Sequence, residues 1–389
     1  MTESIQNISM PQSSKRFAIV DILRGFALLG VAVINYTSFR AWDYSHGNTV
    51  DAVLGFISTY IFFHKSALLL SVLFGYGFAV LISNLQSKNQ NTVLFFIIRM
   101  FWLFVIAFIN SCFFGGDILK SYAVLGIILL LFRNASTKTI LLFAIALFVL
   151  LPLSSGYTTV VASMEPVEKM GKMHHLLLSH QLIDVLTYNL TDSYILQATW
   201  AFYAIFVQHV MLCCFLWGMF FQSIHFFDNL SSNKKYIKRM FWFSILAFAV
   251  STTLTMAEQK NNWLLKYFNF FIIPFISTMV FLMSAIMWLY VSGKLKNIFH
   301  ALQYYGKMTL TNYIMQNIIA FFVFSGIGLS IGNKAPYSFY FILAVAIFVV
   351  QIFTSKYWLS KFNYGPVEYI WRRLSSQKTL PFTKEATDK

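Results

Sequence analysis

Ten runs of apolar residues, most of them long enough to cross a lipid bilayer as a helix, constrain this chain more than any other feature. A bilayer core of about 30 Å requires about 20 apolar residues per helix. Only 11% of the 389 residues are charged, whereas a soluble domain carries about 25%, so an ordinary soluble enzyme is excluded. The predicted spans are Phe17–Tyr36, Ser66–Leu85, Thr92–Phe114, Ile118–Phe132, Thr139–Ser155, Leu196–Gln222, Met240–Met256, Phe268–Val291, Met308–Leu329 and Ser338–Trp358.

A shorter apolar stretch, residues 51–63, lies between Asp51 and the His64-Lys65 pair. Its length of about a dozen residues suits an interfacial or re-entrant helix better than a span. We therefore expect an all-α, polytopic membrane helical bundle with about ten transmembrane helices plus this short helix, and eleven spans is the weaker alternative. One membrane domain is predicted over residues 17–373, with polar tails at 1–16 and 374–389 and one long outer loop at about 156–195 that forms short surface helices.

The charge balance indicates orientation. The chain has 29 Lys and Arg against 14 Asp and Glu, a net charge of +15. No segment is long and polar enough to form a water-exposed basic patch, so no nucleic-acid partner is expected. With ten spans, the segments on one side carry eight basic and eight acidic residues, so the whole excess falls on the other side. Because cytoplasmic loops retain Lys and Arg, we expect a multi-pass protein of the cell membrane with both termini cytoplasmic and the lipid bilayer as its partner.

Metal and soluble-hydrolase chemistry find no support in the sequence. The three cysteines and the histidines of the outer loop do not have the spacing of a zinc site. No GxSxG, HExxH or Walker-type motif is present. No metal and no tightly bound cofactor is therefore expected.

The first span carries polar residues on one face. At 100° per residue, Asp21, Arg24 and Asn35 lie within about 60° of one another. Charged residues in a span cost about 2.5–3.5 kcal/mol each on insertion scales, so this face should be buried against protein. Asp21 and Arg24 are close enough to pair. They form either a structural ion pair or, because guanidinium binds phosphate bidentately, part of an anion site.

Two further polar groups stand out. Gly115-Gly116-Asp117 forms the outer turn after the third span, which contains Asn110, and Asp117 could cap the following helix. The ninth span opens with many hydrogen-bonding side chains, which predicts a polar core between helices or the wall of a pathway. These residues are Lys307, Thr309, Thr311, Asn312, Tyr313, Gln316 and Asn317.

His46 lies in the predicted outer loop after the first span, with Asp43 three residues before it. Histidine is the usual proton carrier near neutral pH. Taken by itself, a loop histidine is more often inert.

Several motifs resemble the YeiB-like family of bacterial multi-pass membrane proteins, which is catalogued as domain of unknown function 418. They occur in order from about Asp21 to Arg373, and the last two are the most distinctive. The motifs are Val20-Asp21-Ile22-Leu23-Arg24-Gly25, Leu73-Phe74-Gly75, Gly116-Asp117-Ile118-Leu119, Gly306-Lys307-Met308-Thr309-Leu310-Thr311-Asn312-Tyr313 and Gly365-Pro366-Val367-Glu368 with Trp371-Arg372. The resemblance implies the fold more than the activity.

The stretch from Asp21 to Gly47 is also distantly similar to transmembrane acyltransferases of the heparan-glucosaminide N-acetyltransferase type. In those enzymes an Asp-x-x-Arg-Gly helix ends in Asn-Tyr, and a catalytic histidine follows in the outer loop. The resemblance implies that His46 would inherit the catalytic role. The chain departs from two related patterns. Other acyltransferases of this superfamily have the catalytic histidine at the end of the first helix, where this chain has Asn35. YeiB-like relatives often have a histidine a few residues before Gly-Asp-Ile-Leu, where this chain has Asn110.

If this resemblance holds, acyl-CoA is the donor substrate, and Arg24, together with Lys307 or Arg99, would hold its phosphates. His46 would act as general base on an envelope glycan or small-molecule acceptor, Asp43 or Asp117 would orient it, and Asn35 or Asn110 would stabilise the oxyanion. The remaining residues expected to contact substrate are Asp21, Asn110, Asn312, Tyr313 and Gln316. The alternative is a transporter or flippase whose path these groups line. A homo-oligomer is left open.

Overall fold

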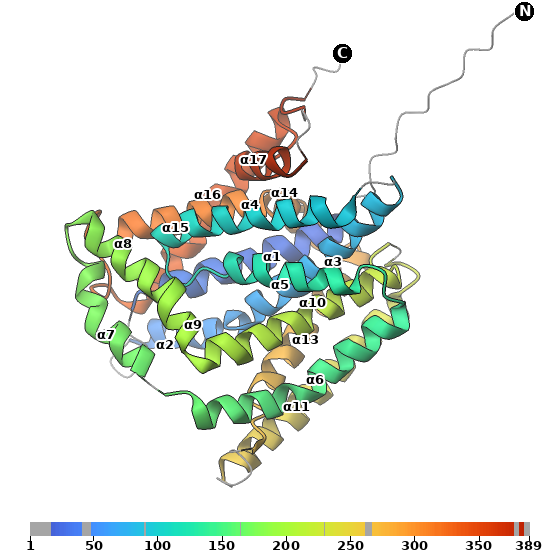
Figure 1. Cartoon of the computed structure of the whole chain (residues 1–389), viewed down its shortest axis with the longest axis horizontal. Helices are drawn as coiled ribbons and strands as arrows, with labels where there is room; N and C mark the ends of the chain where they lie inside the picture. Colours follow the sequence, from blue (N-terminus) through green and yellow to red (C-terminus); the bar gives the residue numbers. More distant parts are fainter. Residues whose placement is uncertain are drawn as a thin grey trace, which may run out of the picture.

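The computed structural model of the chain describes residues 17–40, 48–88, 91–163, 165–228, 230–260, 267–376 and 381–384. Its regular structure is helical (Figure 1). The elements are α1 (Ala18–Thr37), α2 (Thr49–Ile57), η1 (Ser58–Phe62), α3 (Lys65–Gln86), α4 (Thr92–Phe113), α5 (Leu119–Leu129), η2 (Leu130–Phe132), α6 (Thr137–Val161), α7 (Glu165–Leu177), α8 (Leu182–Leu190), η3 (Thr191–Leu196), α9 (Gln197–Thr199), η4 (Phe202–Val207), α10 (Gln208–Ser223), α11 (Lys234–Gln259), α13 (Ile272–Val291), α14 (Lys296–Lys307), α15 (Thr309–Phe324), α16 (Tyr337–Lys361) and α17 (Pro366–Ser376).

The prediction of an all-α membrane bundle with about ten spans is confirmed. Among the described residues, eight helices are long and apolar enough to cross a membrane, and Leu119–Phe132 and Thr309–Phe324 are shorter apolar helices. The boundaries differ most at α6 and α11, which extend beyond the predicted apolar cores at both ends, and at α15, which ends at Phe324. There the chain turns back, with the Leu329 N–H donating to the Phe322 carbonyl at 2.8 Å.

The short helix predicted at residues 51–63 is present as α2 and η1, residues 49–62, and it precedes α3 directly in the chain. Thr49–Gln86 forms one apolar segment of 38 residues, made of α2, the π-helix η1 and α3. The helix breaks at His64, whose φ is 61°. Lys65 follows the break and is only 4% exposed. Its Nζ donates to the Thr59 carbonyl at 2.6 Å and lies 4.4 Å from the Phe275 ring, so the lysine holds the broken helix end inside the protein.

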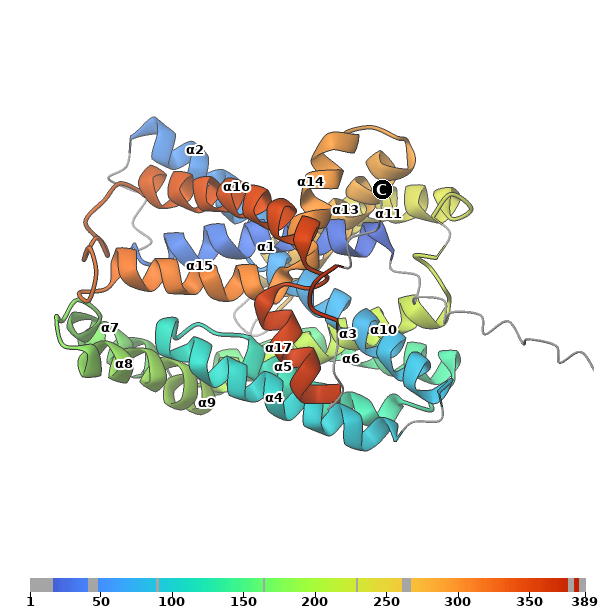
Figure 2. The ribbon, with the colours of Figure 1, turned by 90° about the horizontal axis from the view of Figure 1, so that it is seen from above.

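The centre of the bundle is α1. Two thirds of its apolar window is buried, against 11% for α11, which faces outward along most of its length. Helices α3, α14, α15 and α16 surround α1 (Figures 1 and 2). Glycines allow α1 and α14 to cross closely. A Cβ on Gly25 would overlap the Leu302 carbonyl, and one on Gly306 would overlap the Asp21 carbonyl. The polar face of α1 is therefore enclosed by other helices, as its sequence predicts.

The predicted outer loop does form short helices. α8 and η3 lie beside the carboxyl end of α4, and α7 packs against α8 and η3 (Figure 2). The Gly326 N–H donates to the Leu177 carbonyl at 2.9 Å, which ties the segment to the end of α15. Asn189 Nδ2 donates to the Cys112 carbonyl at 2.9 Å. These bonds hold the segment over one end of the bundle.

Candidate functional site

A continuous chain of hydrogen-bonded side chains joins α1, α15, α4 and the turn after α4. Asn35 Nδ2 on α1 donates to Asn317 Oδ1 on α15 at 3.5 Å. Asn317 Nδ2 donates to Asn110 Oδ1 on α4 at 3.1 Å, and Asn110 Nδ2 donates to Asp117 Oδ1 at 2.8 Å. The Tyr313 hydroxyl donates to the same Asp117 oxygen at 3.0 Å. The structure thus brings together five of the residues that the sequence suggested separately.

Asp117 is the ionisable group of this network and is 1% exposed. Its Oδ1 accepts two hydrogen bonds, whereas its buried Oδ2 has no partner of normal geometry among the described residues. Burial raises the pKa of Asp117 to about 6, against the opposing effects of the Leu119 N–H, Asn110 and Tyr313. The N-cap of α5 is Ile118, without a side-chain cap. The main side-chain partners of Asp117 therefore lie in the network.

The segment of α7, α8 and η3 completes the site with groups that sequence reasoning missed. Lys120 Nζ donates to the Ser193 carbonyl and, at 2.6 Å, to Ser193 Oγ. Ser193 Oγ in turn donates to Ser111 Oγ on α4 at 3.1 Å. The positive charge of Lys120 acts on Asp117 and on Asp192. Two carboxylates therefore lie close enough to interact electrostatically with one lysine where η3 meets the turn.

Gly115 has no side chain, and this permits Asp192 to approach the turn after α4. A Cβ on Gly115 would lie 2.7 Å from Asp192 Oδ2 and 3.0 Å from the Asn189 carbonyl. Burial raises the pKa of Asp192 to about 6, opposed by Lys120 and Gln197. The spacing of Lys120, three residues after Asp117, could have been noticed in the sequence. Nothing in the pattern around Asp192 indicates that it reaches this turn.

The polar residues of α15 divide between two faces. Tyr313 and Asn317 face the Asp117 network, whereas Asn312 and Gln316 face α14 and α16. Asn312 Nδ2 donates to Ser355 Oγ at 3.0 Å. Gln316 Nε2 donates to Gln351 Oε1 at 3.1 Å and to the Tyr305 hydroxyl. The predicted polar core exists, and this half of it joins helices to one another.

The other end of α1 carries the predicted ion pair. Arg24 Nη1 lies 3.4 Å from Asp21 Oδ1, and Asp21 is fully buried while the Arg24 side chain is 27% exposed. Arg24 also lies beside α3, where a Cβ on Gly77 would be 3.1 Å from Nη2. Lys307 ends α14, with Nζ 5.7 Å from the Tyr304 ring centroid. These groups lie far from Asp117, so the predicted site residues form two separate clusters.

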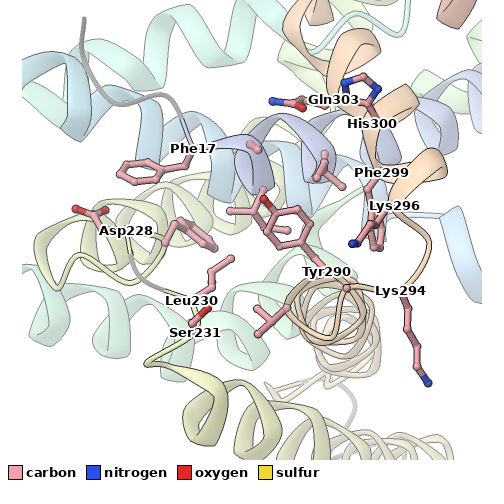
Figure 3. A pocket seen from close by; sticks show the side chains of 16 residues that line it. Phe17, Asp228, Leu230, Ser231, Tyr290, Lys294, Lys296, Phe299, His300 and Gln303 are labelled. Atoms are coloured by element: carbon pink, nitrogen blue, oxygen red, sulfur yellow. The ribbon is translucent and has the colours of Figure 1, made fainter. Parts of the chain in front are cut away.

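A pocket of about 550 Å³ opens at this second end, between the start of α1, the turn before α11, the end of α13 and α14 (Figure 3). Its floor is apolar and includes Ile22, Phe227 and Phe299. Figure 3 shows Asp228 and Lys296 on opposite sides of the pocket, with the Lys294 side chain pointing away. The polar lining residues are Asp228, Ser231, Lys294, Lys296, His300 and Gln303.

His46 and Asp43 lie outside the described residues. Within the described ranges, no group of three His, Cys, Asp or Glu side chains could hold a metal ion. The outer-loop histidine His180 instead contacts the Gly326 carbonyl through Nδ1 at 2.7 Å. The chemistry available at the described site is that of buried carboxylates, carboxamides and one amine.

Sequence comparison finds one family model and several relatives of this chain. A family model described as "Protein of unknown function (DUF418)" matches residues 221–378. The uncharacterized protein YxaH of Bacillus subtilis (strain 168) is 25% identical over 96% of this chain and 97% of its own length. An uncharacterized 39.9 kDa protein of Bacillus acidopullulyticus, encoded in the amylase 3' region, is 24% identical over 94% of this chain and 96% of its own length. The uncharacterized protein YeiB of Escherichia coli (strain K12) is 34% identical over 76 residues, 20% of this chain and 19% of its own. No solved structure matches.

Proposed function

The chain belongs to the YeiB-like DUF418 family of multi-pass membrane proteins, and from this premise we propose that it is an integral-membrane acyltransferase. The donor is cytoplasmic acyl-CoA, with acetyl as the expected acyl group, and the acceptor is an envelope glycan or small molecule on the outer side. One observation carries the proposal: α1 connects the basic-rimmed pocket at one end with the Asp117 network at the other.

The donor end is the pocket that includes Ile22. Lys296 lines it, Lys294 stands at its edge with its side chain directed outward (Figure 3), and Arg24 lies nearby on another face of α1. Lys307 ends the same short helix, α14, that begins at the rim. Ammonium and guanidinium groups suit the phosphates of CoA. Ile22 and Asn35 are separated by about 20 Å along the helix axis, the distance that the pantetheine arm has to cover.

The acceptor end is the Asp117 network. The side-chain amide nitrogens of Asn35 and Asn110 each donate one hydrogen bond within the Asp117 network. Each has a second N–H that can donate to an oxyanion. Asp117, with one unpartnered oxygen, is suited to accept a proton or to orient a base. His46 is the proposed general base, with Asp43 as a further orienting group.

The orientation of the protein in the membrane is part of the same proposal. The pocket lies among connections that are rich in Lys and Arg, which supports a cytoplasmic position for this end and for both termini of a plasma-membrane protein. A cytoplasmic mouth with positive charge would attract an anionic thioester.

The test uses purified protein in lipid nanodiscs, radiolabelled acetyl-CoA and cell-envelope extract. We expect label to enter an acceptor, and we expect Arg24→Ala, His46→Ala and Asp117→Asn to reduce transfer at least tenfold, on the order of one lost catalytic contact. His175→Ala, an exposed outer histidine, is the matched control and should leave transfer unchanged. Absence of transfer by the wild type, or equal transfer by all variants, would reject the proposal.

A transporter or flippase is the second candidate, favoured by the broken helix of η1 and α3 with Lys65 at the break. Discontinuous helices whose ends hold charged groups are typical of transporter binding sites. Vesicles that contain the protein and enclose labelled acetyl-CoA separate the two functions. An acyltransferase cleaves the thioester, whereas a carrier releases it intact.

A further inference from the structure

The helix break between η1 and α3 places a charged side chain inside the bundle. Lys65 is the first residue of α3 and is 4% exposed. Its Nζ donates one hydrogen bond, to the Thr59 carbonyl at 2.6 Å, and lies 4.4 Å from the Phe275 ring centroid. An ammonium group has three N–H donors, and no carboxylate of the described residues lies within ion-pair distance of this one. The charge of Lys65 is therefore buried without a counter-charge from the described part of the chain.

The depth of the break makes this arrangement costly. Ser66 follows Lys65, and a Cβ on Gly30 would overlap Ser66 Oγ. Gly30 is the thirteenth of the 20 residues of α1, so the break lies along the length of α1 and not beside its end. A charge at such a depth is expensive, and in membrane proteins it pairs with other groups or marks the site of an ion or a substrate.

The start of α3 offers hydrogen-bond donors and has no side-chain cap. The N-cap residue is His64, whose side chain makes no capping bond, and the first N–H groups of a helix have no partner within the helix. Ser66 is 4% exposed, and its hydroxyl has no hydrogen-bond partner among the described residues. The hydroxyl reaches back across the break, because the Cβ that would overlap it on Gly30 would also lie 2.6 Å from Phe62 Cδ1. Side-chain and backbone donors thus meet at the positive end of a 22-residue helix.

A cavity of about 70 Å³ adjoins this first turn of α3. His64, Ala67 and Leu68 line it, together with residues of η4, α10 and the start of α13. The His64 ring contacts the Phe63 and Phe275 rings, and no hydrogen bond joins it to the rest of the described chain. A cavity needs about 10–15 Å³ to hold one water molecule, so this one has room for a small ion.

We propose that the start of α3 binds a small monovalent anion, held by the Lys65 ammonium, the Ser66 hydroxyl and the first backbone N–H groups of the helix. These groups donate hydrogen bonds, and the ammonium carries a positive charge, so they suit an anion and repel a cation. One negative charge balances the single charge of Lys65. The helix N-terminus stabilises the same sign of charge.

The site goes beyond both functions proposed above and depends on neither. A halide ion and a short carboxylate share the required chemistry, a single negative charge on a small body. Chloride and acetate represent these two sources. Gluconate carries the same charge on a much larger, hydroxylated body and serves as the reference anion.

The experiment measures the thermal unfolding midpoint of the purified full-length protein in detergent. The protein is exchanged into sodium gluconate and titrated with sodium chloride or sodium acetate at constant ionic strength. An anion that binds the folded protein raises the midpoint once its concentration exceeds its dissociation constant. We expect a rise with chloride alone if the site takes halides, with acetate alone if it takes carboxylates, and with both if it takes either.

Two variants at the break test the donors. Ser66→Ala should raise the half-saturating concentration about tenfold, the loss of one hydrogen bond to a charged group. Lys65→Met keeps a long side chain without the charge and should abolish the rise.

Ser71→Ala and Lys88→Met are the matched controls. Ser71 is a buried serine further along α3, and its Oγ is hydrogen-bonded to the Tyr122 hydroxyl at 2.9 Å. Lys88 is an exposed lysine after the same helix. Both control variants should titrate as the wild type does, whatever their own midpoints.

The proposal is overturned if neither anion raises the midpoint above its value in gluconate, if Lys65→Met responds as Lys88→Met does, or if Ser66→Ala responds as Ser71→Ala does. Ser66→Ala removes a single oxygen, so it decides the outcome by itself if Lys65→Met does not give folded protein.

Discussion

Asn317 donates from Nδ2 to Asn110 Oδ1 at 3.1 Å, so one carboxamide on α15 is bonded directly to one on α4 in the fully buried interior. Asn110 Nδ2 also donates to Asp117 Oδ1, and Asn317 Oδ1 accepts from Asn35 Nδ2. Each carboxamide therefore serves as donor to one neighbour and acceptor from another. Removing Asn110 leaves Asn317 Nδ2 without its acceptor and takes one of two hydrogen bonds from Asp117 Oδ1.

Asn110→Ala should destabilise the protein by about 1–3 kcal/mol, because Asn317 Nδ2 and Asp117 Oδ1 each lose a partner in a buried site. The measurement is the unfolding midpoint in detergent. Asn297→Ala, at an exposed position on α14, is the control and should stay within about 0.5 kcal/mol of the wild type. Equal midpoints for the two variants would mean that the network is not formed.

Stability should fall as pH rises through the titration of Asp117. The pKa is raised from 3.8 to about 6 in the folded protein, so folding favours the protonated form and this advantage is present below about pH 4. It is lost as the folded carboxyl ionises near pH 6, by about 3 kcal/mol at most. Unfolding curves between about pH 4 and about pH 7 measure it.

Asp117→Asn should flatten this pH dependence, because the amide cannot ionise. The pKa of Asp192 is raised in the same direction, so Asp192→Asn should remove a further part of the slope. A wild-type protein that becomes more stable from about pH 4 to about pH 7, while Asp117→Asn does the same, would contradict the assignment.

Gly306→Ala should separate α1 from α14 and cost about 1–3 kcal/mol, because the added Cβ would overlap the Asp21 carbonyl. The readout is again the unfolding midpoint. Gly171→Ala is the matched control, since a Cβ there meets nothing within 4 Å. It should stabilise the α7 helix by about 0.5–1 kcal/mol, so the two substitutions should shift the midpoint in opposite directions.

Glu368→Ala should destabilise the start of α15 by about 0.5–2 kcal/mol, because the carboxylate caps the Leu310 and Thr311 N–H groups. Glu368→Gln keeps one acceptor oxygen and should lose less. Glu168→Ala on the exposed surface of α7 is the control for loss of a glutamate. An equal effect of Glu368→Ala and Glu168→Ala on the midpoint would rule out the cap.

Single cysteines test the proposed sidedness in a background where Cys112 is replaced by Ser. Glu168→Cys in the outer segment should react with a membrane-impermeant maleimide in intact cells. Lys294→Cys at the pocket rim should react only after the cells are opened. Cys213 and Cys214 are buried and provide the unlabelled background, and the reverse pattern would invert the orientation.

The spans could be predicted from sequence because bilayer thickness imposes a length on each apolar run. The two polar faces of α15 could also be predicted from the sequence. Tyr313 and Asn317 are four residues apart, and so are Asn312 and Gln316, so each pair lies on its own stripe of the helix. The position of Asp192 could not be predicted, because it depends on how a folded outer segment meets Gly115. The break between η1 and α3 likewise depends on the contact of Lys65 with the Thr59 carbonyl, which forms only in the folded protein.

The break before Lys65 has a consequence for biosynthesis. A lysine leaving the translocon within an apolar segment needs partners, and it finds its first one, the Thr59 carbonyl, in residues already made. The ring that covers its ammonium group belongs to Phe275 on α13, which emerges only after most of the bundle has been inserted. The early hairpin of α1 and α3 therefore enters the membrane with an incompletely shielded charge and reaches its final packing late in synthesis.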